Sequence, residues 1–321
     1  MKTMLVLSMG ALLLAGTLSA QTPVPEWQAG VDKMKSLIQT NPAQASEEVG
    51  ELLKGKNKKN VDLVTSVAHV YLDAGKLTEA QEYLAMAKKA DNKDPKVSVL
   101  EGDIALAQKN IGQACQLYEQ AIYFDPNCKE AYLKYAQAYK SASPALAIEK
   151  LEQLKAVAPN CLEADRELAE VYYSSNRFGK AAEMYAKFID TPLATEDDML
   201  KYAFALFLNH DFEKSLQVAQ KGLQKNARHA ALNRLVMYNN TDLKRYEDAE
   251  KAADAFFNAS DHADYSYLDY RYYGALLSAL KKYDEAIIEY GKALEKDDTQ
   301  VDLWREISNA YEMNNNYVEA I

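Results

Sequence analysis

Small and large apolar residues recur along most of the chain with a period close to 34 residues. Within each period, apolar residues fall three or four positions apart, which is the spacing of one face of an α-helix. In most periods a small residue stands at the eighth position and another at the twentieth, with a large residue four positions later. Small residues opposite large ones are typical of two helices that pack closely. The pattern therefore predicts helical hairpins repeated along the chain.

The register of these repeats runs from Val61 to the last residue. If each unit is numbered from 1 to 34, the eight predicted units begin at Val61, Pro95, Lys129, Leu162, Glu196, Ala230, Tyr267 and Val301. Position 8 is small in most units: Ala68, Gly102, Ala136, Ala169, Ala203, Gly274 and Ser308. Position 24 includes the tyrosines Tyr118, Tyr185 and Tyr290. We expect each position-8 residue to face the large residue at position 24 of its own hairpin.

Two units depart from the common length. Unit three has 33 residues because its hairpin is shortened before Pro144, and unit six has 37 because the chain is lengthened through Ser260–Asp264. Length changes of this kind in surface loops cost little. Unit six is also the poorest match, with Met237 at position 8 and Asn240 at position 11. We therefore expect its first helix to pack loosely.

Residues 1–20 have the composition of a signal peptide. A basic residue, Lys2, precedes an apolar stretch from Met4 to Leu14, and small residues follow up to Ala20. The apolar stretch is short for a membrane-spanning helix. We expect cleavage after Ala20 and a soluble, exported mature chain without a transmembrane segment, located in the periplasm or secreted. A retained membrane anchor is the alternative.

Residues 21–60 are predicted to form an extended leader and a degenerate helical hairpin. Helical spacing of apolar residues begins at Trp27, and Asn41 followed by Pro42 is a typical start for the second helix of this hairpin. The basic segment Gly55–Asn60 is predicted to close it as a solvated loop.

Composition and charge exclude several functions. The net charge of −10 and the pI of about 5.1 argue against nucleic-acid binding, for which a basic surface is expected. The sequence contains no phosphate-binding glycine motif, no zinc motif of His and Cys, and no nucleophile elbow. We therefore expect a protein that is not an enzyme and that has no cofactor and no metal site.

The three cysteines are predicted to be free. Cys128 and Cys161 each follow a Pro-Asn pair, one unit apart. Equivalent positions in stacked hairpins lie about 9–10 Å apart, whereas a disulfide needs Cα atoms within about 7 Å. We expect both residues, and Cys115, to be buried or half-buried thiols, with a Cys128–Cys161 disulfide as the alternative. Two sequences, beginning at Asn239 and Asn258, match the glycosylation motif weakly.

The second halves of the units resemble the tetratricopeptide repeat, whose pattern is A-x3-F followed by P. Arg245-Tyr246-Glu247-Asp248-Ala249 and Lys282-Tyr283-Asp284-Glu285-Ala286 open such halves, and Ala114, Tyr118, Ala121 and Pro126 show the spacing. The resemblance implies an all-α, right-handed superhelical solenoid of stacked helix-turn-helix units over residues 61–321, with seven complete units and a truncated eighth. It also implies a scaffold that binds protein segments in its concave groove.

In this family, positions 2, 5, 9, 12 and 13 of the first helix line the groove. Position 5 supplies four arginines, and the same surface supplies five aromatic residues: Arg166, Arg234, Arg271, Arg305, Tyr173, Phe204, Phe207, Tyr238 and Tyr272. Guanidinium groups bind carboxylates in pairs of hydrogen bonds and stack on rings, which suits a peptide with acidic or C-terminal carboxylate groups. Arg305 with Asn309 approximates the family's carboxylate clamp. Local acidic residues beside each arginine are the alternative explanation.

These observations favour a non-enzymatic scaffold that binds a peptide or protein segment. If the arginines lie on an open surface, replacing Arg234 and Arg271 by Ala should change stability by less than about 1 kcal/mol. Two alternatives remain: a glycan-handling component of the outer membrane or periplasm, and a regulatory arm of a larger protein. The chain stops one residue after Ala320, before the last helix could cover its partner. We therefore expect it to be a fragment that continues past residue 321.

Overall fold

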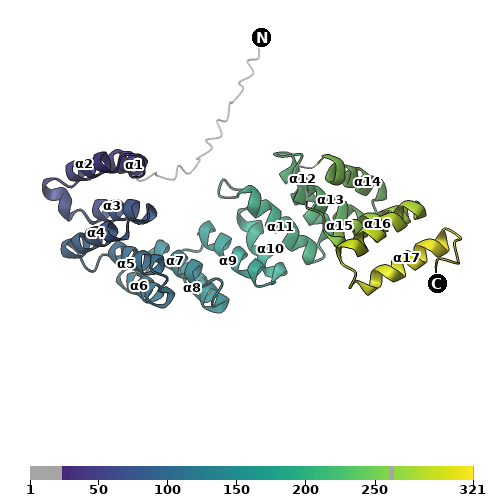
Figure 1. Cartoon of the computed structure of the whole chain (residues 1–321). Helices are drawn as coiled ribbons and strands as arrows, with labels where there is room; N and C mark the ends of the chain where they lie inside the picture. The colour runs from purple at the N-terminus through teal and green to yellow at the C-terminus, as the bar shows by residue number, and fades with distance from the viewer. Residues whose placement is uncertain (1–23, 260–263, 321) are drawn as a thin grey trace, which may run out of the picture. The chain divides into compact units, whose positions relative to one another are not determined.

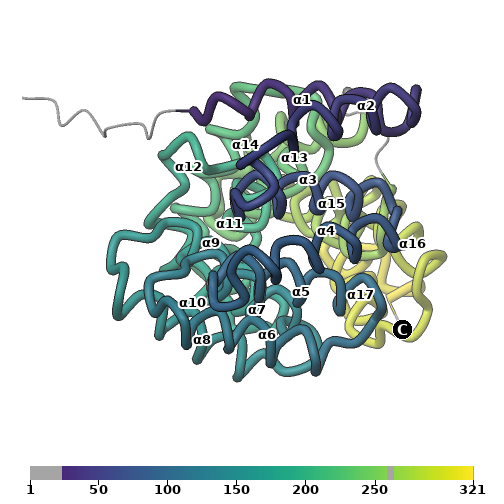
Figure 2. Tube along the Cα trace, turned by 90° about the vertical axis from the view of Figure 1, so that its left-hand side faces the viewer, coloured from purple at the N-terminus to yellow at the C-terminus, as the bar shows by residue number. Residues whose placement is uncertain are grey.

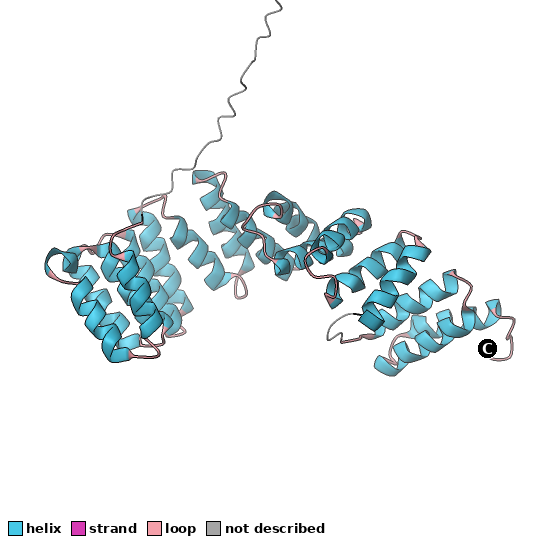
Figure 3. Ribbon diagram, turned by 90° about the horizontal axis from the view of Figure 1, so that it is seen from above, coloured by secondary structure: helices cyan, strands magenta, loops and turns pink. Residues whose placement is uncertain are grey.

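The computed structural model describes residues 24–259 and 264–320, and these residues form helices and turns without a strand (Figure 3). They fall into two compact units, one ending at Asn92 and the other beginning at Lys93. Within each unit, consecutive helices pack as neighbours (Figure 1). The all-α fold of paired helices predicted from the sequence is confirmed. The predicted signal peptide lies outside the described residues.

The first unit contains four α-helices and one short 3₁₀ helix: α1 (Gln28–Leu37), α2 (Pro42–Leu52), η1 (Gly55–Lys59), α3 (Val61–Asp73) and α4 (Leu77–Ala90). As predicted, Asn41 caps α2, because its side chain accepts a hydrogen bond from the Gln44 amide at 3.2 Å. The predicted loop after α2 is instead the 3₁₀ helix η1. The Asn57 side chain ties this turn to α2 by donating to the Leu52 carbonyl at 2.9 Å.

The second unit continues as helix pairs joined by short connections (Figure 2). Its helices are α5 (Pro95–Ala107), α6 (Ile111–Phe124), α7 (Lys129–Tyr139), α8 (Pro144–Val157), α9 (Leu162–Ser174), α10 (Phe178–Phe188), α11 (Glu196–Leu208), α12 (Phe212–Leu223), α13 (Ala230–Asp242), α14 (Tyr246–Asp254), α15 (Tyr267–Ala279), α16 (Tyr283–Lys296) and α17 (Val301–Met313). A π-helical turn, η2 (Ala255–Ala259), extends α14. The odd-numbered helices from α3 to α17 begin at the residues predicted to open each unit. Residues 314–320 form turns.

Most hairpins turn through one residue in the left-handed conformation. Position 15 is Gly75 in the first predicted unit, where φ is 73°, but lysine, asparagine or histidine in later ones: Lys109, Asn176, His210, Lys244, Lys281 and Asn315. In the hairpin of α5, the amide of Lys109 donates to the Leu106 carbonyl and that of Asn110 to the Ala105 carbonyl, a Schellman motif. These bonds satisfy carbonyls at the helix end and offset the strain of a side chain at positive φ. The hairpins thus share one turn without sharing glycine.

The predicted packing of small against large residues is confirmed inside the hairpins. Tyr118 is fully buried, and a methyl group at Gly102 would lie 2.5 Å from its ring. In the hairpin of α15 and α16, a methyl group at Gly274 would lie 2.7 Å from the ring of Tyr290. The two helices of these two hairpins therefore approach closely because position 8 is glycine.

A glycine pair in one hairpin gives a direct stability test. Gly102→Ala should destabilise the fold by about 1–3 kcal/mol, since the added methyl overpacks a core already filled by Tyr118. Gly112 lies in the next helix, and a methyl group added there would have no atom within 4 Å. Gly112→Ala should therefore stabilise the fold by about 0.5–1 kcal/mol, because alanine lowers the conformational entropy of the unfolded chain. Urea unfolding of the two variants would measure both changes. Equal effects would contradict the packing argument.

The three cysteines are free, as predicted. Cys115 and Cys161 are buried and Cys128 is half-buried. Burial raises the pKa of the Cys115 thiol to about 11, so it stays protonated at neutral pH. Asn239, the first residue of one weak glycosylation motif, is fully buried and donates to the Ser215 hydroxyl at 2.8 Å, so it is inaccessible in the folded chain.

Candidate protein-binding surface

The residues predicted to bind a partner lie on the first helices of successive repeats in the second unit. We call the side of α9, α11, α13 and α15 that carries them the helix-A surface: Arg166, Tyr173, Phe204, Phe207, Arg234, Tyr238, Arg271 and Tyr272. The structure brings some of these side chains together and separates others. Tyr173 packs edge-on against Phe178, with ring centroids 5.7 Å apart. Phe204 is half-buried against the core of the next repeat.

Three of the predicted aromatic side chains form one cluster across α11, α13 and α15. The rings of Tyr238 and Tyr272 stack, with centroids 3.9 Å apart and planes 17° from parallel. The ring of Phe207 lies 5.7 Å from Tyr238 and 6.3 Å from Tyr272. Tyr238 is buried, whereas Phe207 and Tyr272 are half-buried and Leu208 is 43% exposed. The cluster thus leaves apolar area accessible on the helix-A surface.

Hydrogen bonds fix the orientation of the two tyrosines. Tyr272 donates to an Asp242 carboxylate oxygen at 2.9 Å, and Tyr238 donates to an Asp269 carboxylate oxygen at 2.8 Å. Burial is the main cause that raises the pKa of both phenols, and the neighbouring carboxylates raise it further. Both hydroxyls are therefore protonated donors at neutral pH. The rings have little freedom to rotate away from the cluster.

Arg234 pairs with a buried carboxylate of the next repeat. Its Nε and Nη2 atoms lie 2.7 and 3.1 Å from the two oxygens of Asp269, which is fully buried. The same carboxylate accepts hydrogen bonds from the backbone amide and hydroxyl of Ser266, at 2.7 and 2.9 Å. Ser266 and Asp269 form the capping box that starts α15. Arg234 therefore completes the helix start of the following repeat.

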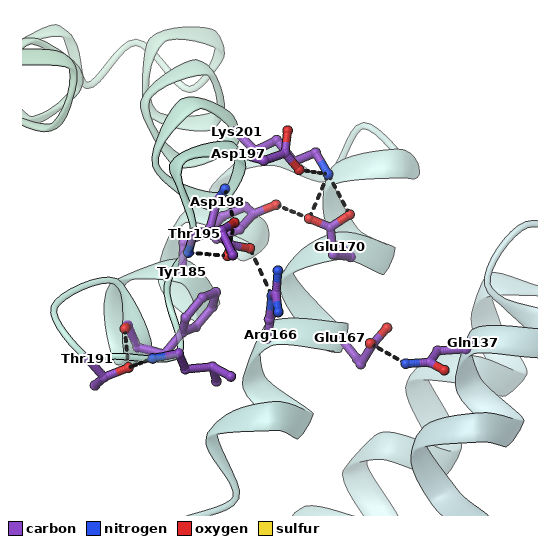
Figure 4. A network of polar contacts seen from close by, with 12 residues as sticks. Gln137, Arg166, Glu167, Glu170, Tyr185, Thr191, Thr195, Asp197, Asp198 and Lys201 are labelled. Carbon is purple, nitrogen blue, oxygen red and sulfur yellow. Dashed lines mark hydrogen bonds and ion pairs between the residues drawn. The ribbon is translucent and has the colours of Figure 1, made fainter. Parts of the chain in front are cut away.

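Arg166 of α9, two repeats before Arg234, also pairs with a buried capping aspartate of the next repeat (Figure 4). Its Nε atom lies 3.0 Å from Asp198, whose side chain is 1% exposed. Asp198 accepts from the backbone amide and hydroxyl of Thr195, at 2.8 and 2.6 Å, in the capping box of α11. Two arginines of the predicted site thus neutralise capping carboxylates between repeats.

A second polar contact joins α9 to α11 (Figure 4). Lys201 lies 2.9 Å from Glu170 and 2.8 Å from Asp197, and the Tyr185 hydroxyl donates to Glu170 at 2.8 Å. Tyr118, Asp103 and Lys134 repeat this arrangement between α5 and α7, at 2.8 Å for the hydroxyl and 3.0 Å for the lysine. A carboxylate that accepts from a tyrosine and pairs with a lysine of the next repeat thus recurs between neighbouring repeats.

The last two predicted arginines differ in their surroundings. Arg271 pairs with Glu306 of α17, with Nη2 2.7 Å and Nε 3.1 Å from one carboxylate oxygen. Arg305 pairs with Asp302 in its own helix at 2.8 Å, and its side chain is 72% exposed. Asn309 is also exposed, but no second cation converges on Arg305 and Asn309 within the described residues. Three of the four arginines are therefore engaged between repeats.

The sequence analysis did not identify the acidic partners of these arginines. It proposed acids close in sequence, and Asp302 is the partner for Arg305, but the partners of Arg166, Arg234 and Arg271 lie in the following repeat. The signal was available: Thr195 and Ser266 are each followed three residues later by an aspartate. Among the described residues, no group of acidic, histidine or cysteine side chains is arranged to hold a metal ion. None of the described helices combines the length and apolar character that membrane crossing requires.

Comparison with known proteins identifies the repeat. Residues 67–127 and 136–193 match the family model for the tetratricopeptide repeat. A search of the curated proteins finds no match to this sequence. Among solved structures, a tetratricopeptide repeat protein from Parabacteroides merdae is 15% identical with a TM-score of 0.47, and covers 78% of this chain and 98% of its own.

Two further solved structures show a similar level of likeness. PilF of Pseudomonas aeruginosa is 14% identical with a TM-score of 0.49, covering 68% of this chain and 96% of its own. YrrB, described as a tetratricopeptide repeat protein with an unusual peptide-binding site, is 15% identical with a TM-score of 0.44, covering 57% and 94%. Likeness at this level says nothing of a ligand or partner. The tetratricopeptide-repeat model thus matches two stretches of this chain, and the other described helix pairs from α3 onward follow the same register.

Proposed function

We propose that this chain is a non-enzymatic scaffold that binds a protein segment along the helix-A surface. The observation that carries the proposal is the cluster of Phe207, Tyr238 and Tyr272, two of whose rings stay half-buried at the surface. Aromatic side chains that are held rigidly and remain accessible are the usual anchors of protein interfaces. The scaffold would act in the periplasm or outside the cell if residues 1–20 direct export.

The charges on this surface favour an apolar segment over an acidic one. Arg166, Arg234 and Arg271 each already bind one carboxylate of the next repeat. Lys201 lies between two carboxylates, and exposed Asp242 accepts from an uncharged tyrosine. The surface therefore carries a surplus of negative charge. A segment with large apolar side chains and a flanking lysine or arginine fits it best, whereas an acidic segment would have to displace existing ion pairs.

A peptide library tests this proposal directly. We expect random peptides selected on the purified chain to be rich in Leu, Phe and Trp with basic flanks. The double variant Phe207→Ala/Tyr272→Ala should bind the selected peptides at least tenfold more weakly, about 1.4 kcal/mol, because it removes the accessible rings. Fluorescence anisotropy with labelled peptides would measure the affinities.

Two controls separate binding from folding. Tyr123 is 83% exposed on α6, away from the helix-A surface, so Tyr123→Ala should leave peptide affinity unchanged. Tyr272→Phe keeps the ring and should retain most of the affinity. Selection of mainly acidic peptides, or equal binding by the Phe207→Ala/Tyr272→Ala variant in its folded state, would contradict the proposed surface.

A further inference from the structure

A polar cavity lies apart from the helix-A surface, between α12, α13 and α14. It has a volume of about 590 Å³, within the range of roughly 300–1,000 Å³ that is common for small-molecule sites. Its walls come from the second helix of one repeat and both helices of the next. None of the residues that form the helix-A surface lines this cavity.

The cavity exists because α13 carries small or polar side chains where the neighbouring first helices carry large ones. Position 7 is Val236 in α13 but Tyr202 in α11. Position 11 is Asn240 in α13, whereas it is Leu206 in α11 and Leu277 in α15, both buried. The corresponding space beside α11, which Tyr202 lines, measures about 250 Å³. The poor match of this unit to the repeat pattern therefore creates a cavity rather than a loosely packed helix.

Asn240 is a buried polar residue that brings a side-chain amide to the cavity wall. It is 3% exposed and lines the cavity, at a position where the neighbouring first helices carry buried leucines. A side-chain amide offers two donors and two acceptor sites, so it can pair with a ligand that both donates and accepts. Gln217 and Gln220 bring further amides to the same space from α12. The cavity is thus lined by groups that both donate and accept.

The charged residues of the cavity are paired with one another. Arg245 binds Glu213 through two hydrogen bonds, at 2.6 and 3.1 Å, and Lys251 lies 3.2 Å from Asp248. Two cations and two anions leave the lining without net charge. A charged ligand would gain little there and would meet one member of each pair with the same sign.

We propose that this cavity binds a neutral, polyhydroxylated molecule of one or two sugar rings. Sugar hydroxyls donate and accept, as the amides of Asn240, Gln217 and Gln220 do, so the two can pair in either direction. The C–H faces of a sugar can lie on Leu216 and Val236, the apolar part of the lining. This site is independent of the helix-A surface.

Titration calorimetry on the full chain with maltose, cellobiose and N,N′-diacetylchitobiose tests the inference. At least one of these sugars should bind, and Asn240→Leu should weaken its binding at least tenfold. Leucine is the residue at this position in α11 and α15, so the variant should fold at least as stably. Gln153 is an exposed amide on α8, outside the cavity, so Gln153→Leu should not change sugar binding.

Three results would overturn the inference. The first is the absence of binding for all three sugars at about 20 mM, well above a millimolar Kd. The second is equal sugar binding by wild type and folded Asn240→Leu. The third is tighter binding of a Gln- and Asn-containing peptide than of any sugar, with loss in Asn240→Leu, which would assign the cavity to a peptide.

Discussion

Arg234→Ala should destabilise the second compact unit by about 3 kcal/mol, the lower end of the cost of breaking a buried ion pair. The reason is that Asp269 is fully buried and Arg234 is its cationic partner. Tyr238 and Ser266 would still donate to the carboxylate, which keeps the loss from being larger. The sequence alone led to an expected change of less than about 1 kcal/mol, because it placed Arg234 on an open surface. The buried carboxylate reverses that expectation.

Hydrogen exchange gives the most specific measurement of this effect. Protection should fall most at the start of α15, whose capping box contains Asp269. Arg305→Ala is the matched control, since its partner Asp302 is exposed and an exposed pair contributes less than about 1 kcal/mol. Similar stability of the two variants would mean that Asp269 does not need its arginine.

Removing both lysines around Asp165 should cost about 3 kcal/mol, although removing either one alone should cost less than about 1 kcal/mol. Asp165 is 2% exposed and lies 2.7 Å from Lys155 and 3.2 Å from Lys187. Each lysine can balance the carboxylate without the other, so the two substitutions should be strongly non-additive. The double variant would leave a buried negative charge without a cation.

A double-mutant cycle in urea would test this redundancy. The wild type, Lys155→Ala, Lys187→Ala and the double variant supply the four free energies of unfolding. Adding Asp165→Asn to the double variant should restore part of the stability, because it removes the unbalanced charge. Additive single effects, or no rescue by asparagine, would argue against two cations sharing one carboxylate.

The sequence predicted the helices well because their determinants are local and periodic. Helix starts at Val61, Pro95 and Glu196 follow from the 34-residue register, and Gly102 opposite Tyr118 follows from the spacing inside one hairpin. The left-handed turn residues were not predicted. Lysine at Lys109 and Lys281 carries no local signal for positive φ, and the Schellman hydrogen bonds that hold it there involve the whole helix end.

The candidate site was predicted only in part. The sequence placed Phe207, Tyr238 and Tyr272 on one surface, and the structure brings them together. It did not predict that Arg234 and Arg166 are engaged, because their partners depend on how one repeat is placed against the next. Whether any of these residues contacts a partner stays a prediction. The cavity beside Asn240 was also missed, since a missing side chain becomes a space only when the neighbouring helices are in place.

The contacts of Arg166 and Arg234 give the array a direction. In both cases the cation comes from the earlier repeat and the capping carboxylate from the later one. A helix start in α11 or α15 is therefore complete only after the repeat before it has folded, whereas no matching dependence runs the other way through this contact. In a nearest-neighbour description of repeat stability, such a contact belongs to the interface energy rather than to either repeat. Ordering of either repeat should thus favour ordering of the other, and under pulling force the later repeat should lose the arginine that supports its helix start as soon as the earlier one opens.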